Sequence, residues 1–164
     1  MDRRTAVAGA FSLVPGFAFA ASAKGTSDDS ASMADKFART LTAHDIPSFA
    51  GLFAESYRNH QTSAAAPPPP SGKSMKQGTV DYFTARLIGI PDLVVTIETV
   101  LVVEGRIAAS FVYSGTHGGV LYGVPPTGKK LRFTSCDIFT VLNGQFVEHW
   151  GMGDIAGVIA QLKG

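Results

Sequence analysis

The hydrophobic spacing of the chain changes near Asp92, and this change limits the folds open to it. Before Asp92, apolar side chains recur at helical intervals, and after it they alternate with polar ones as in a half-buried strand. The expected helices are 31–43, 47–54 and 78–88. The expected strands are 93–103, 107–116, 131–142 and 145–150. Helices followed by antiparallel strands predict an α+β domain in which a helical layer covers one sheet.

Turn and cap residues separate these elements. Asn143-Gly144 is a strong hairpin signal between the last two strands, and Glu104-Gly105 predicts a turn between the first two. Asp45 is placed to cap the second helix, and a short helix over 154–162 closes the chain. Long alternating strands under a helical layer predict a strongly curved, mostly antiparallel sheet with a pocket between sheet and helices.

The N-terminal segment 1–23 has the features of an export signal. A pair of arginines, Arg3-Arg4, precedes an uncharged apolar stretch that ends in small residues suited to cleavage. The pair suggests the twin-arginine route, although Asp2 departs from the full pattern. An uncleaved membrane anchor and cytoplasmic retention are the alternatives. We therefore expect an exported protein, periplasmic or secreted, with no membrane contact once the signal is removed.

Length and charge narrow the remaining possibilities. The chain has 164 residues with 14 basic and 13 acidic side chains, so one domain is expected and nucleic-acid binding is disfavoured. The expected organisation is the signal 1–23, a polar linker 24–32 and one domain over 33–164. The single cysteine, Cys136, excludes an internal disulfide. The four histidines are far apart and lack metal-binding spacing, so no metal site is expected.

A set of short motifs resembles one known family. The segments are Tyr57-Arg58-Asn59-His60, Pro91-Asp92-Leu93, Thr116-His117, 123–129 (GVPPTGK), Asp137-Ile138-Phe139 and 144–154 (GQFVEHWGMGD). In this order they resemble the SnoaL-like polyketide cyclases, also called ester cyclases, over about residues 33–163. No single segment is specific for the family, but the whole set in this order is fairly specific for it. The Ala- and Pro-rich stretch 64–71 departs from the family pattern and is expected to form a loop near the pocket mouth.

The resemblance implies both a fold and a chemistry. The fold is the cone-shaped α+β barrel of the nuclear-transport-factor-two-like superfamily, with about three N-terminal helices over a curved, mostly antiparallel sheet. The chemistry is an intramolecular aldol condensation of a polyketide ester, run without metal or cofactor by an acidic residue. Cone folds of this superfamily often pair through the outer sheet face, so a homodimer is expected. Because one fold hosts many functions, the resemblance does not settle the reaction.

Three residues are candidates for the proton steps. Asp154 comes first, because it follows large apolar residues in one strand phase and best matches the acidic position that the resemblance implies. It also precedes an apolar-periodic helix, where it can serve only as an N-cap. His149 comes second, and strict alternation places it opposite Asp154 unless Gly151 or Gly153 bulges the strand. Asp137 comes third, as a carboxylate on an apolar strand face that is costly unless paired. Either of the last two can instead be a structural hydrogen-bonding residue.

Other residues are expected to contact substrate or to be structural. Asn59 and His60 can donate to a substrate carbonyl, and His117 borders a glycine pair at the pocket rim or a turn. Several aromatic side chains suit either the pocket wall or the core, namely Phe111, Tyr113, Phe133 and Trp150.

These observations predict a cyclase or isomerase that performs cofactor-free acid/base chemistry at a carbon next to a carbonyl. Its partner is expected to be a small apolar molecule that carries a carbonyl group and binds in an apolar pocket. The alternative is an exported protein of the same fold that binds a small apolar ligand without catalysis. An Asp154→Asn variant separates the two hypotheses, because the enzyme would lose turnover whereas the binding protein would keep its affinity.

Overall fold

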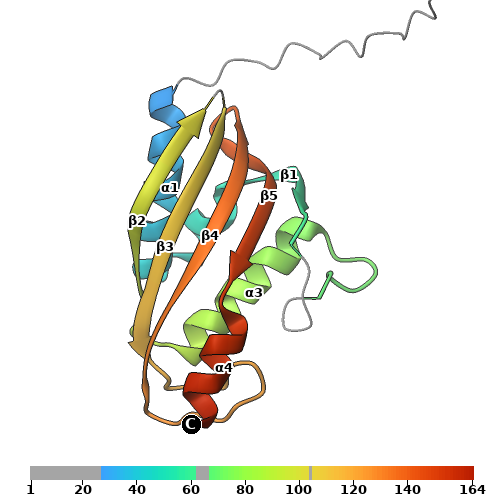
Figure 1. The fold of residues 1–164 in the computed structure, drawn as a ribbon. Coiled ribbons are helices and arrows are strands. Elements are labelled where there is room, and N and C mark those ends of the chain that lie inside the picture. The colour runs from blue at the N-terminus through green and yellow to red at the C-terminus, as the bar shows by residue number, and fades with distance from the viewer. Residues whose placement is uncertain (1–26, 62–66, 104) are drawn as a thin grey trace, which may run out of the picture.

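The computed structural model describes residues 27–61, 67–103 and 105–164 (Figure 1). Its helices are Ser27–Thr42 (α1), Ile46–Gly51 (α2), Met75–Gly89 (α3) and Ile155–Lys163 (α4). Its strands are Phe53–Asn59 (β1), Val94–Val103 (β2), Arg106–Thr116 (β3), Lys130–Leu142 (β4) and Gln145–Gly153 (β5). The predicted α+β fold is confirmed, with the helical half before the main strands and a short helix at the end.

The five strands form one curved, open sheet in the order β1-β5-β4-β3-β2. Neighbouring strands are antiparallel except β1 and β5, which run parallel. Figure 1 shows α1 and α3 behind the sheet, while α4 continues from the end of β5. The helices therefore cover one face of the long strands and leave the other face open. This is the expected cone-shaped arrangement, in a form that does not close into a barrel.

The strand β1 is the element that the sequence pattern did not predict. Helical spacing extends the second helix to residue 54, whereas α2 ends at Gly51 and β1 begins at Phe53. Burial does not alternate along β1, because Phe53 and Tyr57 are its only buried residues. Its conformation comes from pairing with β5, where Phe53 lies opposite Phe146. A strand defined by such a distant partner carries little local signal.

An aromatic cluster holds the helices on the sheet. The ring of Phe37 in α1 lies 4.9 to 6.2 Å, between centroids, from rings of both helical and strand layers. Its partners are Phe49, Phe83, Phe111, Phe139 and Phe146. Burying one such side chain contributes about 1.5–3 kcal/mol to stability. The cluster makes a solid core, and only Phe83 among these rings also borders the cavity described below.

A bulge in β5 decides which of its side chains face the helices. The register between β4 and β5 shifts by one residue at Val147, which has no opposite residue in β4. As a result His149 is buried with 5% of its surface exposed, while Trp150 turns outward with 36% exposed. The sequence analysis allowed a bulge only at Gly151 or Gly153, and the structure has it upstream of both.

The predicted cap of α2 and the last hairpin turn are confirmed, while Glu104 of the other predicted turn lies outside the described residues. Asp45 accepts a hydrogen bond from the Ser48 amide at 3.0 Å at the start of α2. Asn143 and Gly144 have φ angles of 52° and 71°, as a tight hairpin turn requires.

The N-terminal part of the chain is described from Ser27 onward. α1 begins at that residue, within the stretch 24–32 that was expected to be a linker. The expected export signal 1–23 lies outside the described residues. None of the helices in the described ranges is both long enough and apolar enough to cross a bilayer.

Candidate active site

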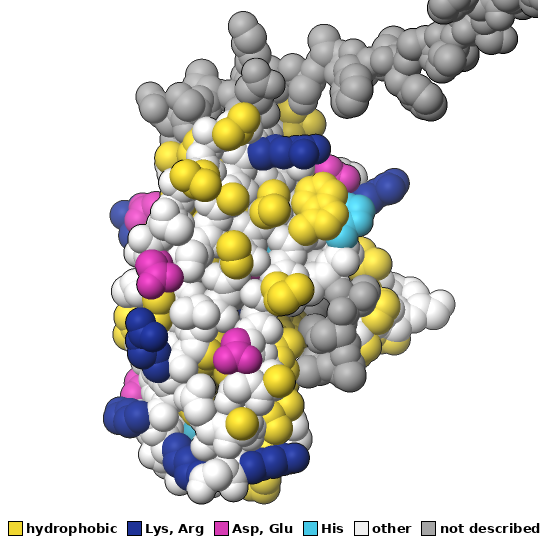
Figure 2. Space-filling model, viewed as in Figure 1, with side chains coloured by type: hydrophobic (Ala, Val, Ile, Leu, Met, Phe, Trp, Pro, Cys, Tyr) yellow, Lys and Arg dark blue, Asp and Glu magenta, His cyan; other side chains and the backbone are white. Residues whose placement is uncertain are grey.

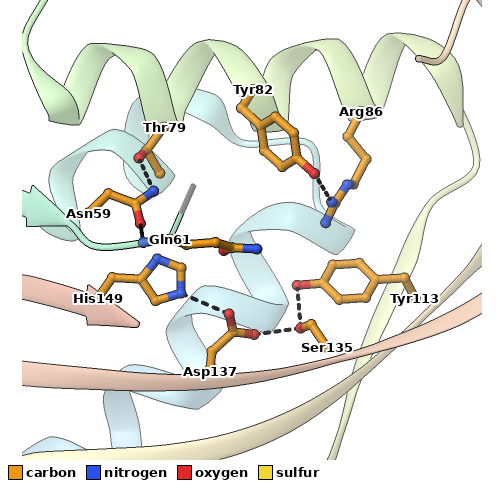
Figure 3. Close-up of polar contacts among 9 residues, drawn as sticks. All are labelled: Asn59, Gln61, Thr79, Tyr82, Arg86, Tyr113, Ser135, Asp137 and His149. Carbon is orange, nitrogen blue, oxygen red and sulfur yellow. Dashed lines mark hydrogen bonds and ion pairs between the residues drawn. The ribbon is translucent and has the colours of Figure 1, made fainter. Parts of the chain in front are cut away.

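A cavity of about 310 Å³ lies between α3 and the helix-covered face of the sheet. Its exposed rim includes Lys73, Asp81 and the prolines 67–70, so the described part of the predicted loop 64–71 borders it. Its buried end is lined by polar side chains from α3 and three strands, which Figure 3 shows together. These are Arg86, Tyr113, Ser135, Asp137 and His149. The pocket expected between sheet and helices is therefore present.

Asp137 and His149 form a buried pair in the wall of this cavity (Figure 3). His149 Nε2 lies 2.8 Å from Asp137 Oδ1, and the side chains are 7% and 8% exposed for His149 and Asp137. An ionised carboxylate can only accept, so with Asp137 ionised the Nε2–H of His149 is the donor. The imidazole also stacks on Phe139, with centroids 4.5 Å apart and planes 12° apart. Pairing and stacking together fix the orientation of both groups.

Gly151 leaves the space in which this pair meets. The register of β4 and β5 puts Gly151 directly opposite Asp137. A Cβ atom at this position would overlap Asp137 Oδ1 and lie 2.5 Å from His149 Nε2 and 2.9 Å from Gln61 Oε1. A side chain of any size is therefore incompatible with the observed pair.

Ser135 and Tyr113 extend the polar group along the cavity wall. The Ser135 hydroxyl donates to Asp137 Oδ2, and its oxygen lies 3.5 Å from the hydroxyl of Tyr113. Burial raises the pKa of Tyr113 well above its ordinary value, and the charge of Asp137 adds to the effect. The phenol therefore keeps its proton at neutral pH and can donate a hydrogen bond to a substrate oxygen.

Arg86 projects from α3 into the same buried region. It is 6% exposed, and its Nη2 donates to the hydroxyls of Tyr82 at 2.8 Å and Tyr122 at 3.2 Å. The two phenol oxygens are themselves 2.8 Å apart. The guanidinium carbon also lies 4.8 Å from the ring centroid of Tyr113 and 5.3 Å from that of Phe133. A positive charge is thus held against aromatic rings beside the Asp137–His149 pair.

Arg86, Tyr82 and Ser135 were not predicted as site residues, although each has a signal in the sequence. Arg86 comes three residues after Phe83, so it lies on the buried side of its helix. A charge there destabilises the fold unless it is paired or hydrogen-bonded. Tyr82 is one helical turn before Arg86 and therefore lies on the same face of α3. Ser135 comes two residues before Asp137 and shares its strand face.

Asn59, a predicted substrate contact, lines the cavity from the end of β1. Its Oδ1 accepts a hydrogen bond from the Gln61 amide at 2.9 Å, and its Nδ2 lies 3.4 Å from Thr79 Oγ1. The second distance is long for a hydrogen bond between nitrogen and oxygen. The amide N–H groups of Asn59 are therefore weakly engaged and suited to donate to a ligand.

Asp154, the first sequence candidate for proton transfer, is not among the residues that line the cavity. It is exposed, and its Oδ1 accepts a hydrogen bond from the Gly157 amide at 2.8 Å, which caps α4. Its expected place among large apolar side chains is wrong, because the bulge at Val147 turns this phase of β5 outward. Met152, in the same phase, is 78% exposed. Asp154 therefore caps α4, which is the alternative that the sequence had left open.

His60 and Trp150, two more predicted substrate contacts, pack on each other outside the cavity. Their rings stack with centroids 4.4 Å apart and planes 6° apart, and His60 Nε2 lies 3.4 Å from Glu148 Oε1. Both residues are partly exposed, so their position is a correction to the expected pocket lining.

Three further candidates are buried without lining the cavity. Phe111 belongs to the aromatic core around α1, and Phe133 stacks behind Tyr113 with centroids 5.0 Å apart. His117 is fully buried in the segment after β3, where its Nδ1 accepts from the Thr127 amide at 3.1 Å. Among the predicted site residues, Asn59 and Tyr113 line the cavity together with Asp137 and His149.

The sequence and the fold agree with one protein family. A family model for the SnoaL-like polyketide cyclases matches residues 31–162. The chain belongs to the SnoaL-like polyketide cyclase family. The resemblance recognised in the short motifs is therefore confirmed. A sequence search of curated proteins finds no match.

Several solved structures share the fold of this chain. TsrD from Streptomyces laurentii is similar with a TM-score of 0.72 at 21% identity, covering 85% of this chain and 98% of TsrD. IdmH from Streptomyces antibioticus has a TM-score of 0.69 at 24% identity, covering 82% of this chain and 98% of IdmH. A SnoaL-like polyketide cyclase from Agrobacterium tumefaciens has a TM-score of 0.61 at 15% identity, covering 80% and 95%. At these identities the likeness establishes the fold.

Proposed function

We propose that this SnoaL-like protein catalyses cofactor-free acid/base chemistry at a carbon next to a carbonyl, either an intramolecular aldol cyclisation or an isomerisation. The observation that supports it is the buried Asp137–His149 pair in the wall of the cavity. Such a carboxylate meets a substrate without bulk water between them, and apolar and aromatic side chains around it exclude competing reactions. Proton transfer by a positioned carboxylate contributes about 10²–10⁴-fold to a rate.

We assign the proton transfer to Asp137 and a positioning role to His149. The second ring nitrogen of His149, Nδ1, is buried and makes no hydrogen bond to the described residues, so a substrate does not reach it without rearrangement. Asp137 borders the cavity while it accepts one hydrogen bond from His149 and one from Ser135. Both donors hold the carboxylate in place and leave its remaining lone pairs for the substrate.

The proposed reaction is balanced in protons, and the proton that Asp137 holds between its two steps also exchanges with solvent through the exposed rim of the cavity. Asp137 takes a proton from the carbon next to the carbonyl, and the electrons of the broken C–H bond form an enolate. The Tyr113 phenol donates a hydrogen bond to the enolate oxygen, where negative charge develops. In the aldol direction the enolate carbon attacks a second carbonyl of the same molecule, and the new alkoxide takes the proton back from Asp137. In an isomerisation the proton returns to another carbon.

Exchange of a substrate proton with solvent tests this assignment without requiring the natural substrate. Ethyl 2-methylacetoacetate has one hydrogen between two carbonyl groups, and ¹H NMR in D₂O follows its replacement by deuterium. We expect the wild-type protein to accelerate exchange and Asp137→Asn to lose about 10²-fold or more of that acceleration. Asp35→Asn, which alters an exposed carboxylate on α1, is the matched control. Equal acceleration by Asp137→Asn would refute the role of Asp137. Bound keto ester without any exchange would favour the non-catalytic binding protein.

A homodimer is a second proposal, and the open face of the sheet supports it. Large apolar side chains on this face are partly or largely exposed, and Figure 2 shows hydrophobic groups spread over it. They are Leu101, Val103, Ile138, Trp150 and Met152. Exposed apolar groups gathered on one face mark interaction surfaces. We propose that a second copy of the chain covers this face.

We also propose that the segment 1–23 directs export.

A further inference from the structure

Arg86 brings a full positive charge into the cavity wall without a negative partner. The side chain is 6% exposed, and no carboxylate of the described residues lies within ion-pair distance of it. Asp137, the buried carboxylate of the same cavity, is engaged by His149 and Ser135 instead. A buried charge that stays unpaired costs several kcal/mol, so proteins rarely keep one without a function.

The surroundings of Arg86 orient the guanidinium but do not neutralise it. The hydroxyls of Tyr82 and Tyr122 accept its Nη2 hydrogens, and burial raises the pKa of Tyr82 to about 12, so this phenol is neutral at physiological pH. The guanidinium carbon lies 4.8 to 5.3 Å from the centroids of four aromatic rings. Such contacts attract a cation, yet they carry no net charge.

Donor groups of Arg86 remain open. Within the described part of the chain its hydrogen bonds run from Nη2 only. Nε is enclosed without a partner, like His149 Nδ1, whereas Nη1 donates to no residue and is not enclosed, so Nη1 is the donor that a ligand can reach. Nη1 carries two hydrogens, and a hydrogen bond from a guanidinium to a carboxylate oxygen is roughly twice as strong as one between neutral groups. The open donor and the uncompensated charge therefore both favour a ligand with a carboxylate group.

The geometry points to a substrate that is a carboxylic acid, whose carboxylate pairs with Arg86 while its reacting carbonyl lies against Asp137 and Tyr113. Arg86 and the proton-transfer group lie on either side of one residue: the guanidinium is over the ring of Tyr113, whose hydroxyl is 3.5 Å from Ser135 Oγ. A charge at one end and an acid/base group at the other would fix the direction in which the substrate enters. This inference rests on the proposed function, because it names the substrate class of the same cavity. It sharpens the expected apolar carbonyl compound into an acid with an apolar body.

A matched pair of unreactive probes tests the inference by binding alone. 1-Naphthoate carries an apolar body and a carboxylate, and its methyl ester has the same body without the charge. Isothermal titration calorimetry at pH 7 is expected to show that wild-type protein binds the acid more tightly than the ester. In Arg86→Met the affinity for the acid is expected to fall about 10-fold or more, with the affinity for the ester little changed. Arg58→Met, which alters an exposed arginine of β1, is expected to leave both affinities unchanged.

Each alternative outcome of this test overturns the inference. Equal affinity of wild-type protein for acid and ester, no binding of 1-naphthoate, or an unchanged acid affinity in Arg86→Met would each do so. If Arg86→Met does not fold by circular dichroism, Arg86→Lys keeps the charge without the planar fork and is expected to weaken acid binding by a smaller factor. A variant that slows proton exchange in kcat but leaves KM and acid affinity intact would assign Arg86 to the developing enolate, which also overturns the inference.

The same experiment separates this inference from the proposed function. Asp137→Asn is expected to lose proton exchange and to keep its preference for the acid over the ester, because Arg86 remains. Acid binding that depends on Arg86 in a protein that exchanges no proton would leave the inference standing and refute the catalytic proposal. Proton exchange that depends on Asp137 in a protein indifferent to the carboxylate would do the reverse.

Discussion

The two faces of the β4–β5 strand pair carry opposite exceptions to the usual distribution of side chains. On the helix-covered face, Asp137 and His149 are polar and buried. On the open face, their sequence neighbours Ile138 and Trp150 are apolar and exposed, and lie opposite each other in the register. Buried polar groups and exposed apolar clusters both cost stability. A fold that keeps such groups therefore points to a role for them in binding or catalysis. One strand pair thus carries the proposed reaction site on one face and the proposed docking surface on the other.

This comparison makes the two faces separable by experiment. Residues that point to opposite sides of a sheet share no contacts, so substitutions on one face should act independently of the other. Chemistry should respond to the inner face and association to the outer face.

The largest effect is expected from Gly151→Ala, because the new methyl group must occupy the place where Asp137 and His149 meet. We expect proton exchange to fall about 10²-fold or more and the free energy of unfolding to drop by about 1–3 kcal/mol from overpacking. NMR exchange rates and urea titration measure the two effects. Gly51→Ala adds the same methyl group in α2, where no side chain lies within 4 Å of it. It is expected to leave proton exchange unchanged and not to lower the free energy of unfolding, because alanine favours a helix over glycine by about 0.4–1 kcal/mol. Full activity in Gly151→Ala would show that the observed pair is not needed.

A charge in the outer apolar cluster should affect association alone. We expect Trp150→Glu to convert the proposed dimer to a monomer, because an unpaired charge in an apolar interface carries a desolvation cost, while the exchange rate stays unchanged. Sedimentation velocity reports the mass, and Lys36→Glu, at an exposed position of α1 on the other side of the sheet, is the control. A wild-type monomer at high protein concentration would refute the dimer outright.

Variants of Asp154 test which residue transfers the proton: Asp137, as we propose from the structure, or Asp154, as the sequence predicted. Asp154→Ala removes the acceptor for the Gly157 amide and is expected to cost about 1 kcal/mol of unfolding free energy, whereas Asp154→Asn retains a capping group and costs less. Neither variant is expected to slow proton exchange. A loss of about 10²-fold in a normally folded Asp154→Asn would return the acid/base role to this residue.

The smallest effect concerns Asp92, an exposed carboxylate that, like Asp137, accepts a hydrogen bond from a hydroxyl. Hydrogen bonds from the Thr116 hydroxyl and amide lower the pKa of Asp92 below its ordinary value. A lowered pKa in the folded state stabilises the protein above the unfolded-state pKa of about 4, and this contribution is lost as the pH falls through the folded-state pKa. Asp92→Asn should therefore have a lower urea midpoint than wild type at pH 7, with the difference shrinking in acid. A difference that grows at low pH would contradict this reading.

Much of the fold could be predicted because its signals are local. The alternation after Asp92 predicted the starts of β2 to β5 to within one residue, and Asn143-Gly144 located the last hairpin. The same alternation put Asp137 on a buried face, since β4 has no bulge before it and its burial alternates regularly. His149 could not be oriented in this way, because a bulge at Val147 reverses the phase of β5 and depends on how that strand packs.

The sequence by itself determined the layers, the turns, the helix caps and the family, because periodicity, turn residues and short motifs are properties of neighbouring residues. The tertiary structure alone decided which distant side chains meet. It paired Asp137 with His149 across a bulged register, placed β1 beside β5, and brought Arg86 of α3 over the ring of Tyr113. These contacts join residues far apart in the chain, and their formation depends on the packing of a whole sheet against its helices. The physical reason is that secondary structure follows local preferences, whereas a site exists only where those elements converge.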